Sequence, residues 1–600
     1  MVFIFLFLIL LKGPGQCQRG NQRKMTKDDL VVKSKSKSNK DVKTKEVKFK
    51  SKEVKEAKAE IKENAKTEER KKRPLPEQQP QQEEKILKKK QKKALREERK
   101  ALKPGFEVQS EMRRICQTVH RKNVGTDEKA SFVEQAVQLI EQHPAELASK
   151  HDTSRDIQAV IRYANAGQIE RMGVAFQSCF WELVEGSAKY SVHVLGRLMR
   201  ATQSSRPREL FSLLLKGKML RLLKLNDASG LVDDLYRRLS CTERSAFVSE
   251  LYGPEFLLFS TKESLAQIVA AKPAKKDLIA ANLKTVLLAL KDKKRAMNFA
   301  LVHRLLDEWL SLLSPKEAAS EVAEWMEQVD ALAATAEGCR AIARLVAAGS
   351  AKERKQLLKA LKPHYASLLR SGDSVIALLA LAEYTDDTVL LGKGLLEEGN
   401  LLLKETILSA ALSSEMRGAR RLLLLLLAGR RGEYITPETV AFLAACDPLA
   451  SLSSRKDPAI RRKELQAVLL PAVLAAIREE PTKFFSQFAA AFVPLETLIL
   501  LDDLSILSDI VPDLKHFLEA SKVHGAFLKM LCKKSPLAAL VIWKMARPIV
   551  EQIVSIDSTF RLSSLLHHPE VLSLAKADSS LKTVLSSVPA AKDLSELLKN

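Results

Sequence analysis

Aliphatic residues return at a fixed interval of 37 positions in the middle of the chain. One row consists of Ile157, Val194, Leu231, Ile268, Leu305 and Ile342. A second row, four residues later in each unit, consists of Ile161, Leu198, Leu235, Trp309 and Val346, and Lys272 interrupts it once. Because positions i and i+4 lie on one face of an α-helix, the rows predict one helix per unit whose apolar stripe is covered by the neighbouring units.

Two further units fit this pattern with altered spacing, around residues 374–378 and 419–423. The leucine run at residues 422–426 is apolar on every side, which predicts that it is buried. Residues 460–600 keep a helical pattern but lose the 37-residue phase. We therefore expect a repeat array at residues 104–455, followed by C-terminal helical repeats at residues 456–600.

The composition also favours an all-α fold. The chain has 600 residues, more than one hydrophobic core usually organises, and a repeat array avoids this limit by growing in one dimension. Aromatic residues make up 5% of the chain, and 22 Gly and 22 Pro leave few residues for the turns that many hairpins require. The expected fold is an α-solenoid.

Residues 25–103 are rich in lysine and poor in large apolar residues. From residue 24 to 103 there are 29 Lys and Arg against 15 Asp and Glu, which accounts for more than half of the net charge of +25. Such a segment cannot offset its ordering entropy, so we expect a disordered basic tail with transient helix near residues 84–102. Two clusters are of the nuclear-import type, Arg70, Lys71, Lys72, Arg73 and Lys88, Lys89, Lys90. The alternative is a charge run that only aids solubility.

The first residues, MVFIFLFLILL, are strongly apolar. The run is about half as long as a membrane-spanning helix and lacks the basic n-region of a signal peptide. Met25 opens the segment MTKDDLVVKSKSKSNK, which is typical of the start of a nuclear protein. We expect residues 1–24 to be a mispredicted extension, with a hydrophobic secretory leader as the alternative.

Charge and cysteine usage narrow the choice of partners. The net charge of +25 favours polyanions, nucleic acid above all. The seven cysteines lie tens of residues apart and form no CxxC pair, which argues against a zinc site and favours a reducing compartment. We expect no metal, no other cofactor and no membrane partner.

The segment HDTSRDIQAVIRY, residues 151–163, carries the sharpest local motif. Ser154 and Gln158 lie one helical turn apart, and Arg155 lies beside them. A hydroxyl and an amide can hydrogen-bond to the edge of a base, while a planar guanidinium can stack on a neighbouring ring. This spacing predicts a helix that reads one base.

These features resemble the Puf, or Pumilio-type, RNA-binding repeat family, whose repeats of similar length carry an S-R-x-x-Q triplet on the second helix. The chain is most similar to the nucleolar Puf-A branch, the branch of Pumilio homologue three with a C-terminal CPL region. The segments that carry this resemblance are KYSVHVLGRLM (189–199), LNDASGLVDDLY (225–236), ELYGPEF (250–256), LVHRLLDEW (301–309), EGCRAIARLVAAGSAKERKQLLKALK (337–362), YTDDTVL (384–390) and KDPAIRRKEL (456–465).

The resemblance covers roughly residues 104–600. It implies Puf-type three-helix repeats in an α-solenoid bent into an L-like shape, and residence in the nucleus and nucleolus. It also implies a part in ribosome biogenesis with pre-ribosomal RNA and pre-ribosomal proteins, and binding of RNA or DNA with little base preference. The basic tail adds import receptors as expected partners.

The triplet is complete in the first unit alone. In chain order the triplet positions hold Ser154, Arg155, Gln158; Ser191, Val192, Leu195; Ala228, Ser229, Val232; Leu265, Ala266, Val269; Val302, His303, Leu306; Cys339, Arg340, Ala343; Ser374, Val375, Leu378; and Ala419, Arg420, Leu423. An aliphatic third residue cannot hydrogen-bond to a base edge, so the later units cannot apply a one-base-per-repeat code.

Sequence-tolerant phosphate contacts remain the expected mode of binding. The candidates are Arg155, Lys189, Arg197, Arg200, Lys216, Lys218, Arg221, Lys224, Lys291, Lys293, Lys294, Arg295, Arg340, Arg344, Arg417, Arg420, Arg421, Arg461, Arg462 and Lys463. Within them, Lys218, Arg221 and Lys224 are spaced i, i+3, i+6, which predicts a basic stripe on one helix.

Catalytic motifs are not found. The ten histidines are scattered, no HExxH or phosphate-binding glycine loop occurs, and His303 fits a packed or capping role better than that of a general base. We expect a non-catalytic nucleic-acid-binding scaffold. The alternatives are a sequence-specific Puf-type regulator of mRNA translation and a protein-interaction scaffold of the HEAT or armadillo kind.

Overall fold

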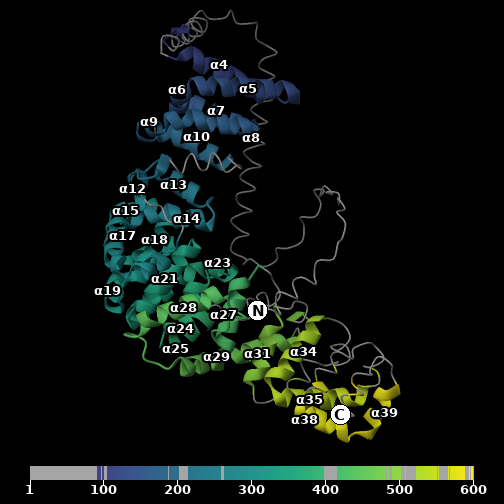
Figure 1. Cartoon of the computed structure of the whole chain (residues 1–600). Helices are drawn as coiled ribbons and strands as arrows, with labels where there is room; N and C mark the ends of the chain where they lie inside the picture. The colour runs from purple at the N-terminus through teal and green to yellow at the C-terminus, as the bar shows by residue number, and fades with distance from the viewer. Residues whose placement is uncertain are drawn as a thin grey trace, which may run out of the picture. The chain divides into compact units, whose positions relative to one another are not determined.

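The computed structural model describes residues 105–479, with gaps at 187, 202–213, 259–262 and 398–414, together with parts of 483–598 and six residues between 91 and 99. The chain divides into two units, Met1–Lys103 and Pro104–Asn600. The expected leader at residues 1–24 and both import clusters lie outside the described residues. Within the second unit the described residues form helices and no strands, which confirms the all-α prediction (Figure 1).

The repeat array consists of helices that follow one another closely. Its first part contains α4 (Phe106–Val119), α5 (Thr126–Gln142), α6 (Pro144–Ser149), α7 (His151–Tyr163), α8 (Ala166–Ser178), α9 (Phe180–Glu185), α10 (Ala188–Ala201), α12 (Met219–Leu223), α13 (Ser229–Tyr236), α14 (Cys241–Ser249), α15 (Pro254–Leu258) and α16 (Leu265–Ala271). Its second part contains α17 (Lys276–Lys291), α18 (Ala300–Leu312), α19 (Pro315–Trp325), α20 (Val329–Leu332), α21 (Ala336–Ala348), α22 (Ala351–Leu361), α23 (Tyr365–Arg370), α24 (Ile376–Tyr384) and α25 (Thr388–Leu391).

The C-terminal part begins with α27 (Arg417–Ala428). The helices that follow are α28 (Pro437–Ala450), α29 (Pro458–Glu479), α31 (Phe492–Leu500), α34 (Lys522–Lys534), α35 (Pro536–Ala546), α38 (Pro569–Ala577) and α39 (Ser579–Ser587). The leucine run of α27 is buried, as its all-round apolar pattern predicts. None of the described helices is both long and apolar enough to span a lipid bilayer.

Each regular unit contains a long helix, a short helix and a third helix that we call the inner helix, as in α8–α9–α10 and α19–α20–α21. Capping boxes start three of the long helices: Asn165 caps α8, Ser314 caps α19 and Ser350 caps α22. In each box the cap side chain accepts a hydrogen bond from the backbone N–H three residues later. The side chain of that later residue accepts a hydrogen bond from the backbone N–H of the cap. The same local sequence signal therefore begins these three units.

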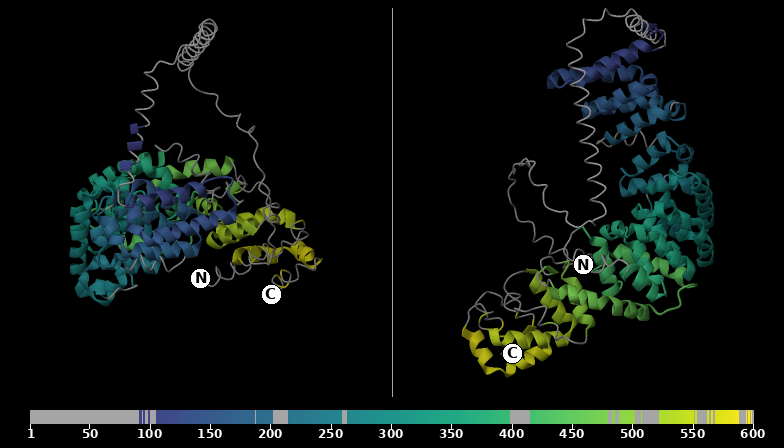
Figure 2. Two further views of the ribbon diagram at one scale, coloured as in Figure 1. Left: turned by 90° about the horizontal axis from the view of Figure 1, so that it is seen from above. Right: turned by 180° about the vertical axis from the view of Figure 1, so that it is seen from behind.

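The inner helices form the core of the array. The first-row residues Ile157, Val194, Leu231, Ile268, Leu305 and Ile342 are all buried. Helix α10 packs between α7 and α13, and α21 packs between α18 and α24. The helices of the array succeed one another in chain order in the view from behind (Figure 2, right). The 37-residue period therefore predicts the stacking correctly for most of the array.

The fourth unit departs from this order. The rows predict that α16 lies between α13 and α18, but α13 packs directly against α18. The Ala300 N–H donates to Asp233 Oδ1 at 3.0 Å, and Arg295 Nη1 donates to the Asn226 carbonyl at 2.8 Å. Helix α16 ends before Lys272, since this second-row position is polar and the following proline disfavours continuation of the helix. The unit in which Lys272 interrupts the second aliphatic row is therefore the unit whose inner helix does not pack between its neighbours.

Candidate nucleic-acid interface

Helices α7 and α10 pack together and expose basic side chains at helical spacing. On α7 the exposed Arg155 and Arg162 are seven residues apart, and on α10 Lys189, His193, Arg197 and Arg200 follow at intervals of four, four and three residues. We call these six residues the α7–α10 basic surface. Arg197 is half-buried and the other five are exposed.

Few carboxylates neutralise the α7–α10 basic surface. Arg200 pairs with Asp234 at 2.7 Å. Arg155, Arg162 and Arg197 form no ion pair with any residue that the structure describes. These guanidiniums keep their N–H donors available to an incoming anion.

The carboxylate of Asp152 lies at the edge of this surface. It is bound by His151 and by Arg113 of α4. The hydrogen bond from His151, followed by that from Arg113, lowers the pKa of Asp152 below its ordinary value. Its charge is therefore already compensated, so that it opposes an approaching phosphate less than a free carboxylate would.

Arg162 and His193 are members of this surface that the sequence analysis missed. The signal was present, because Arg162 follows Arg155 by seven residues and His193 lies midway between Lys189 and Arg197. Neither residue belongs to a contiguous basic cluster, so a pattern of adjacent cations does not reveal them.

The complete triplet of the first unit does not present a base-reading set. Ser154 is only 2% exposed, and its hydroxyl donates to the His151 carbonyl at 2.9 Å. The half-buried Gln158 donates to the Ser154 carbonyl at 3.2 Å. Of the three residues, only Arg155 is exposed to solvent. The prediction that Ser154 contacts a base is wrong, because packing places the first triplet position inside the array.

The third triplet position is buried in six units. Leu195, Val232, Leu306, Ala343, Leu378 and Leu423 belong to the core, while Gln158 and Val269 are half-buried. These side chains fill the contacts between neighbouring helices instead of facing solvent. The loss of a one-base-per-repeat code therefore follows from their position as well as from their chemistry.

The cluster at residues 216–224 does not form the helical stripe that its spacing predicts. Helix α12 has five residues, with Lys218 and Lys224 as the caps at its two ends. The Lys218 ammonium lies 4.5 Å from the centre of the Trp181 ring, and Arg221 pairs with Glu185 at 2.8 Å. Lys216 and Lys224 remain exposed. The turn at Gly217, which has a φ of 75°, prevents the longer helix.

Arg340 and Arg344 share one carboxylate. Their Nε atoms donate to the two oxygens of Asp307, at 3.1 and 2.6 Å respectively, and both guanidiniums lie over the Phe442 ring. The Arg344 side chain is 9% exposed, whereas that of Arg340 is 48% exposed. Arg344 is therefore an internal ion-pair residue, and its prediction as a phosphate contact is wrong. Arg340 remains in that set.

The candidates at residues 461–463 also separate by burial. Arg461 is 3% exposed and donates to Asp386 at 2.7 Å and to the Glu383 carbonyl. Its prediction as a phosphate contact is wrong, because it joins α29 to the end of α24. Arg462 is half-buried, with Glu383 Oε1 at 4.0 Å, and Lys463 is exposed.

Three arginines lie in the first turn and a half of α27. Arg417 is exposed, and Arg420 and Arg421 are half-buried. Burial and the charge of Arg417 lower the pKa of Arg420. Arg421 donates to the Gly372 carbonyl, with Asp373 at 3.6 Å. This group concentrates positive charge at the start of the C-terminal region.

Two of the remaining basic candidates bond within the array. Lys291 donates to Glu324 at 2.8 Å and lies over the Trp325 ring, and Arg295 bonds to the Asn226 carbonyl. Lys293 and Lys294 are exposed.

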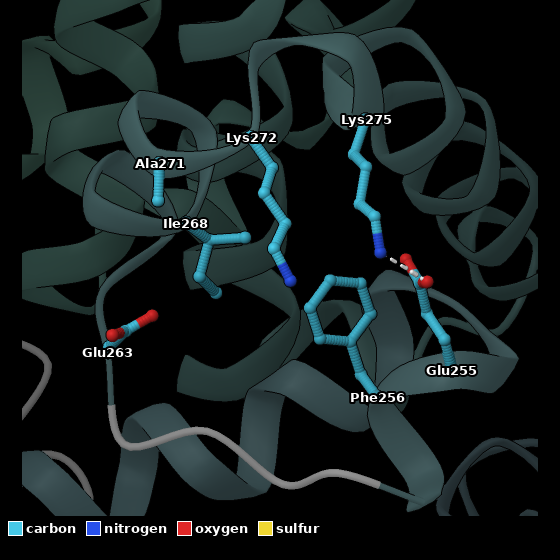
Figure 3. A pocket seen from close by; sticks show the side chains of 7 residues that line it. All are labelled: Glu255, Phe256, Glu263, Ile268, Ala271, Lys272 and Lys275. Carbon is cyan, nitrogen blue, oxygen red and sulfur yellow. Dashed lines mark hydrogen bonds and ion pairs between the residues drawn. The ribbon is translucent and has the colours of Figure 1, made fainter.

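Two cavities flank the displaced helix α16. One, of about 290 Å³, lies between α15 and α16 and is drawn in Figure 3, where the Lys272 side chain extends toward Phe256 and Lys275 pairs with Glu255. The other, of about 400 Å³, is lined by residues of α13, α14, α16, α18 and α21. Among the described residues, no group of three or more His, Cys, Asp or Glu side chains is arranged to hold a metal ion.

His303 occupies a packed position, as expected. Its Nδ1 lies 2.6 Å from Thr335 Oγ1 and its Nε2 lies 2.6 Å from the Met297 carbonyl. Burial lowers the pKa of the imidazole from 6.5 to about 4, so the ring is neutral at physiological pH. It joins the inner helices of two successive units.

Comparisons with known proteins agree with this architecture. Residues 417–512 match the CPL (NUC119) domain, so the match begins at α27, before the boundary expected at residue 456. The chain is 27% identical to Pumilio homolog 3 of Rattus norvegicus over 380 residues, covering 63% of this chain and 57% of the relative. It is 25% identical to Pumilio homology domain family member 6 of Schizosaccharomyces pombe, covering 68% of this chain and 62% of that protein. The chain thus matches less than two thirds of the length of these curated relatives.

Two solved structures have the same fold. The crystal structure of human Puf-A superposes with a TM-score of 0.65 at 21% identity, covering 82% of this chain and 100% of that one. The crystal structure of human Puf-A in complex with DNA gives a TM-score of 0.69 at 23% identity, covering 83% and 100%. The chain is a Puf-type α-solenoid. The CPL match, the similarity to Pumilio homolog 3 and the likeness to human Puf-A support the Puf-A branch of these solenoids.

Proposed function

We propose that this protein binds RNA and DNA through sequence-tolerant phosphate contacts and has no catalytic role. The observation that carries the proposal is the α7–α10 basic surface, where Arg155, Arg162 and Arg197 lie on adjacent helices without ion-pair partners among the described residues. A polyanion that covers them gains charge-assisted hydrogen bonds and releases counterions.

The alternative of a base-specific translational regulator finds little support in the geometry. Direct readout requires exposed side chains that can hydrogen-bond to base edges. The inner helices bury the third triplet residue in six units and Ser154 in the first. Phosphate contact from exposed cations does not depend on those positions.

The cellular role that fits this chemistry is a nucleolar scaffold in ribosome biogenesis. In this proposal pre-ribosomal RNA is the principal ligand, pre-ribosomal proteins are neighbours, and import receptors bind the basic clusters at Arg70–Arg73 and Lys88–Lys90. The likeness to Pumilio homolog 3 and the basic tail support the proposal. Crosslinking followed by sequencing of the bound RNA tests it: enrichment of messenger RNA without ribosomal precursors would contradict it.

A charge-reversal variant tests the surface itself. In the full chain, Arg155→Glu with Arg197→Glu should weaken binding to RNA and DNA alike and reduce the salt slope by about 0.7 to 1 for each phosphate that is no longer neutralised. The matched control is Lys352→Glu with Lys355→Glu, which makes the same change in charge at exposed positions of α22. Equal affinities of the two variants, measured by fluorescence anisotropy, would show that the surface is misplaced.

A further inference from the structure

The larger cavity beside α16 lies where the regular stack is interrupted. Because α13 packs directly against α18, the first turn of α16 is left at the margin of a space of about 400 Å³. Ala266 of α16 and Arg340 of α21 line it, and both hold the second triplet position of their units, the position that Arg155 holds in the first unit. Two residues of the lining therefore hold the repeat position that Arg155 holds in the first unit.

Four guanidinium groups and three carboxylates line this cavity. Arg244, Arg304, Arg340 and Arg344 contribute positive charge, against the carboxylates of Asp307, Glu308 and Glu337. Arg244 donates from Nε and Nη2 to the carbonyls of Tyr236 and Arg237. None of the described carboxylates pairs with it. The half-exposed Arg340 uses Nε alone on Asp307. Several N–H donors thus remain for an anion.

The carboxylates of the cavity differ in their availability. Asp307 is held by two arginines, and Glu308 accepts from Arg304 and from the Tyr252 hydroxyl, both at 2.8 Å. The half-buried Glu337 accepts no hydrogen bond from any residue that the structure describes. It is therefore an acceptor that can take an N–H donor from a ligand, such as the exocyclic amino group of a base.

The apolar part of the lining is small. Leu265 and Ala266 of α16 supply it together with Tyr236, whose ring is buried beneath the Arg244 guanidinium, and the volume falls within the range of small-ligand pockets. Planar guanidiniums favour stacking with a planar ligand. A phosphoserine or phosphothreonine side chain has the anion but no planar ring beside it.

We propose that this cavity binds one unstacked nucleotide whose base carries an exocyclic amino group. Its phosphate contacts Arg340 and Arg244, and its amino group donates to Glu337. This inference rests on the proposed nucleic-acid binding and adds one base-selective position to an otherwise sequence-tolerant array.

The thiol of Cys241 provides a direct probe of occupancy. It is exposed on the lining of the cavity, whereas Cys116, Cys339, Cys446 and Cys532 are buried and Cys179 is half-buried. In the full chain with Cys17→Ser and Cys179→Ser, AMP at about ten times its dissociation constant should slow maleimide labelling of Cys241 about tenfold. Equal protection by UMP or inorganic phosphate, or no protection by AMP, would overturn the proposal.

Two variants connect this protection to the cavity. Ala266→Trp fills the space without changing its charge and should abolish protection by AMP. Ala270→Trp, also exposed on α16 but outside the lining, is the matched control and should retain it. Glu337→Ala should equalise AMP and UMP. Protection that survives in Ala266→Trp would place the nucleotide elsewhere.

Binding of oligonucleotides separates this inference from the proposed function. Ala266→Trp should weaken binding of a single-stranded oligoadenylate of about 20 nucleotides by about tenfold relative to Ala270→Trp, and leave a blunt RNA duplex unaffected. If the charge reversals at Arg155 and Arg197 weaken binding but AMP does not protect Cys241, the cavity proposal fails alone. If AMP protects while those reversals have no effect, the proposed surface fails alone.

Discussion

The carboxylate of Asp233 accepts a hydrogen bond from the backbone N–H of Ala300, at 3.0 Å and across 67 residues of chain. Ala300 begins α18, and its N–H has no partner within that helix, so a side chain of α13 caps a helix two units later. Arg237 holds the second oxygen of Asp233 at 2.6 Å.

Asp233→Ala should therefore lower the free energy of unfolding by about 1–3 kcal/mol, because it leaves a buried N–H without an acceptor. The neighbouring Asp234→Ala, which removes only the more exposed pair with Arg200, should cost less than about 1 kcal/mol. Urea denaturation of both variants compares them. Equal losses would mean that the link between α13 and α18 adds no stability.

Leu306→Gln tests the position of the third triplet residue. Leu306 is fully buried, so an amide there should cost about 3 kcal/mol and should create no base preference. Val269→Gln is the matched control, because Val269 is the equivalent residue of α16 and is half-buried. Thermal unfolding and binding to four homopolymers measure both effects. A stable Leu306→Gln protein with a new preference would contradict the assignment.

The shared carboxylate of Asp307 supports a third prediction. Its removal in Asp307→Ala leaves the buried Arg344 guanidinium without a counter-charge, which should cost about 3–5 kcal/mol. Asp373 is 83% exposed and lies 3.6 Å from Arg421, so Asp373→Ala should be close to neutral. The difference in urea midpoint between the two variants is the measurement.

The imidazole of His303 makes stability depend on pH in a defined window. Its pKa is about 4 in the folded protein and 6.5 otherwise, so the unfolded chain binds more protons between these values. The contribution is complete above pH 6.5 and decreases by about 3 kcal/mol as the pH falls to 4. In His303→Gln this loss of stability between pH 6.5 and pH 4 should disappear. Parallel melting-temperature profiles of the two proteins from pH 7 to pH 4 would contradict the assignment.

The repeat period carries most of the information that the sequence contains about the fold. Residues such as Ile157 and Ile342 are buried because helical spacing and the need to cover an apolar stripe both require it. The direct packing of α13 on α18 could not be derived in this way. In the short helix α16 the first-row residue Ile268 is apolar and the second-row residue Lys272 is polar, so the two rows give opposite indications for that unit.

The candidate site was less predictable, because arginine serves two purposes in this array. Arg155 and Arg461 both follow helical spacing, yet one faces solvent and the other binds Asp386 inside the protein. Their difference depends on carboxylates and carbonyls that are distant in sequence. The burial of Ser154 likewise depends on how tightly α7 packs against its neighbours.

The buried triplet positions also limit how recognition in this protein can be redesigned. Where triplet residues are exposed, exchanging two side chains can retarget a repeat without disturbing its neighbours. Here the exchange at Leu195 or Leu378 would disrupt the packing before any base was contacted. New specificity would require transplanting whole units with their adjoining helices. The smallest part of this solenoid that can be exchanged is therefore a pair of repeats and not a single residue.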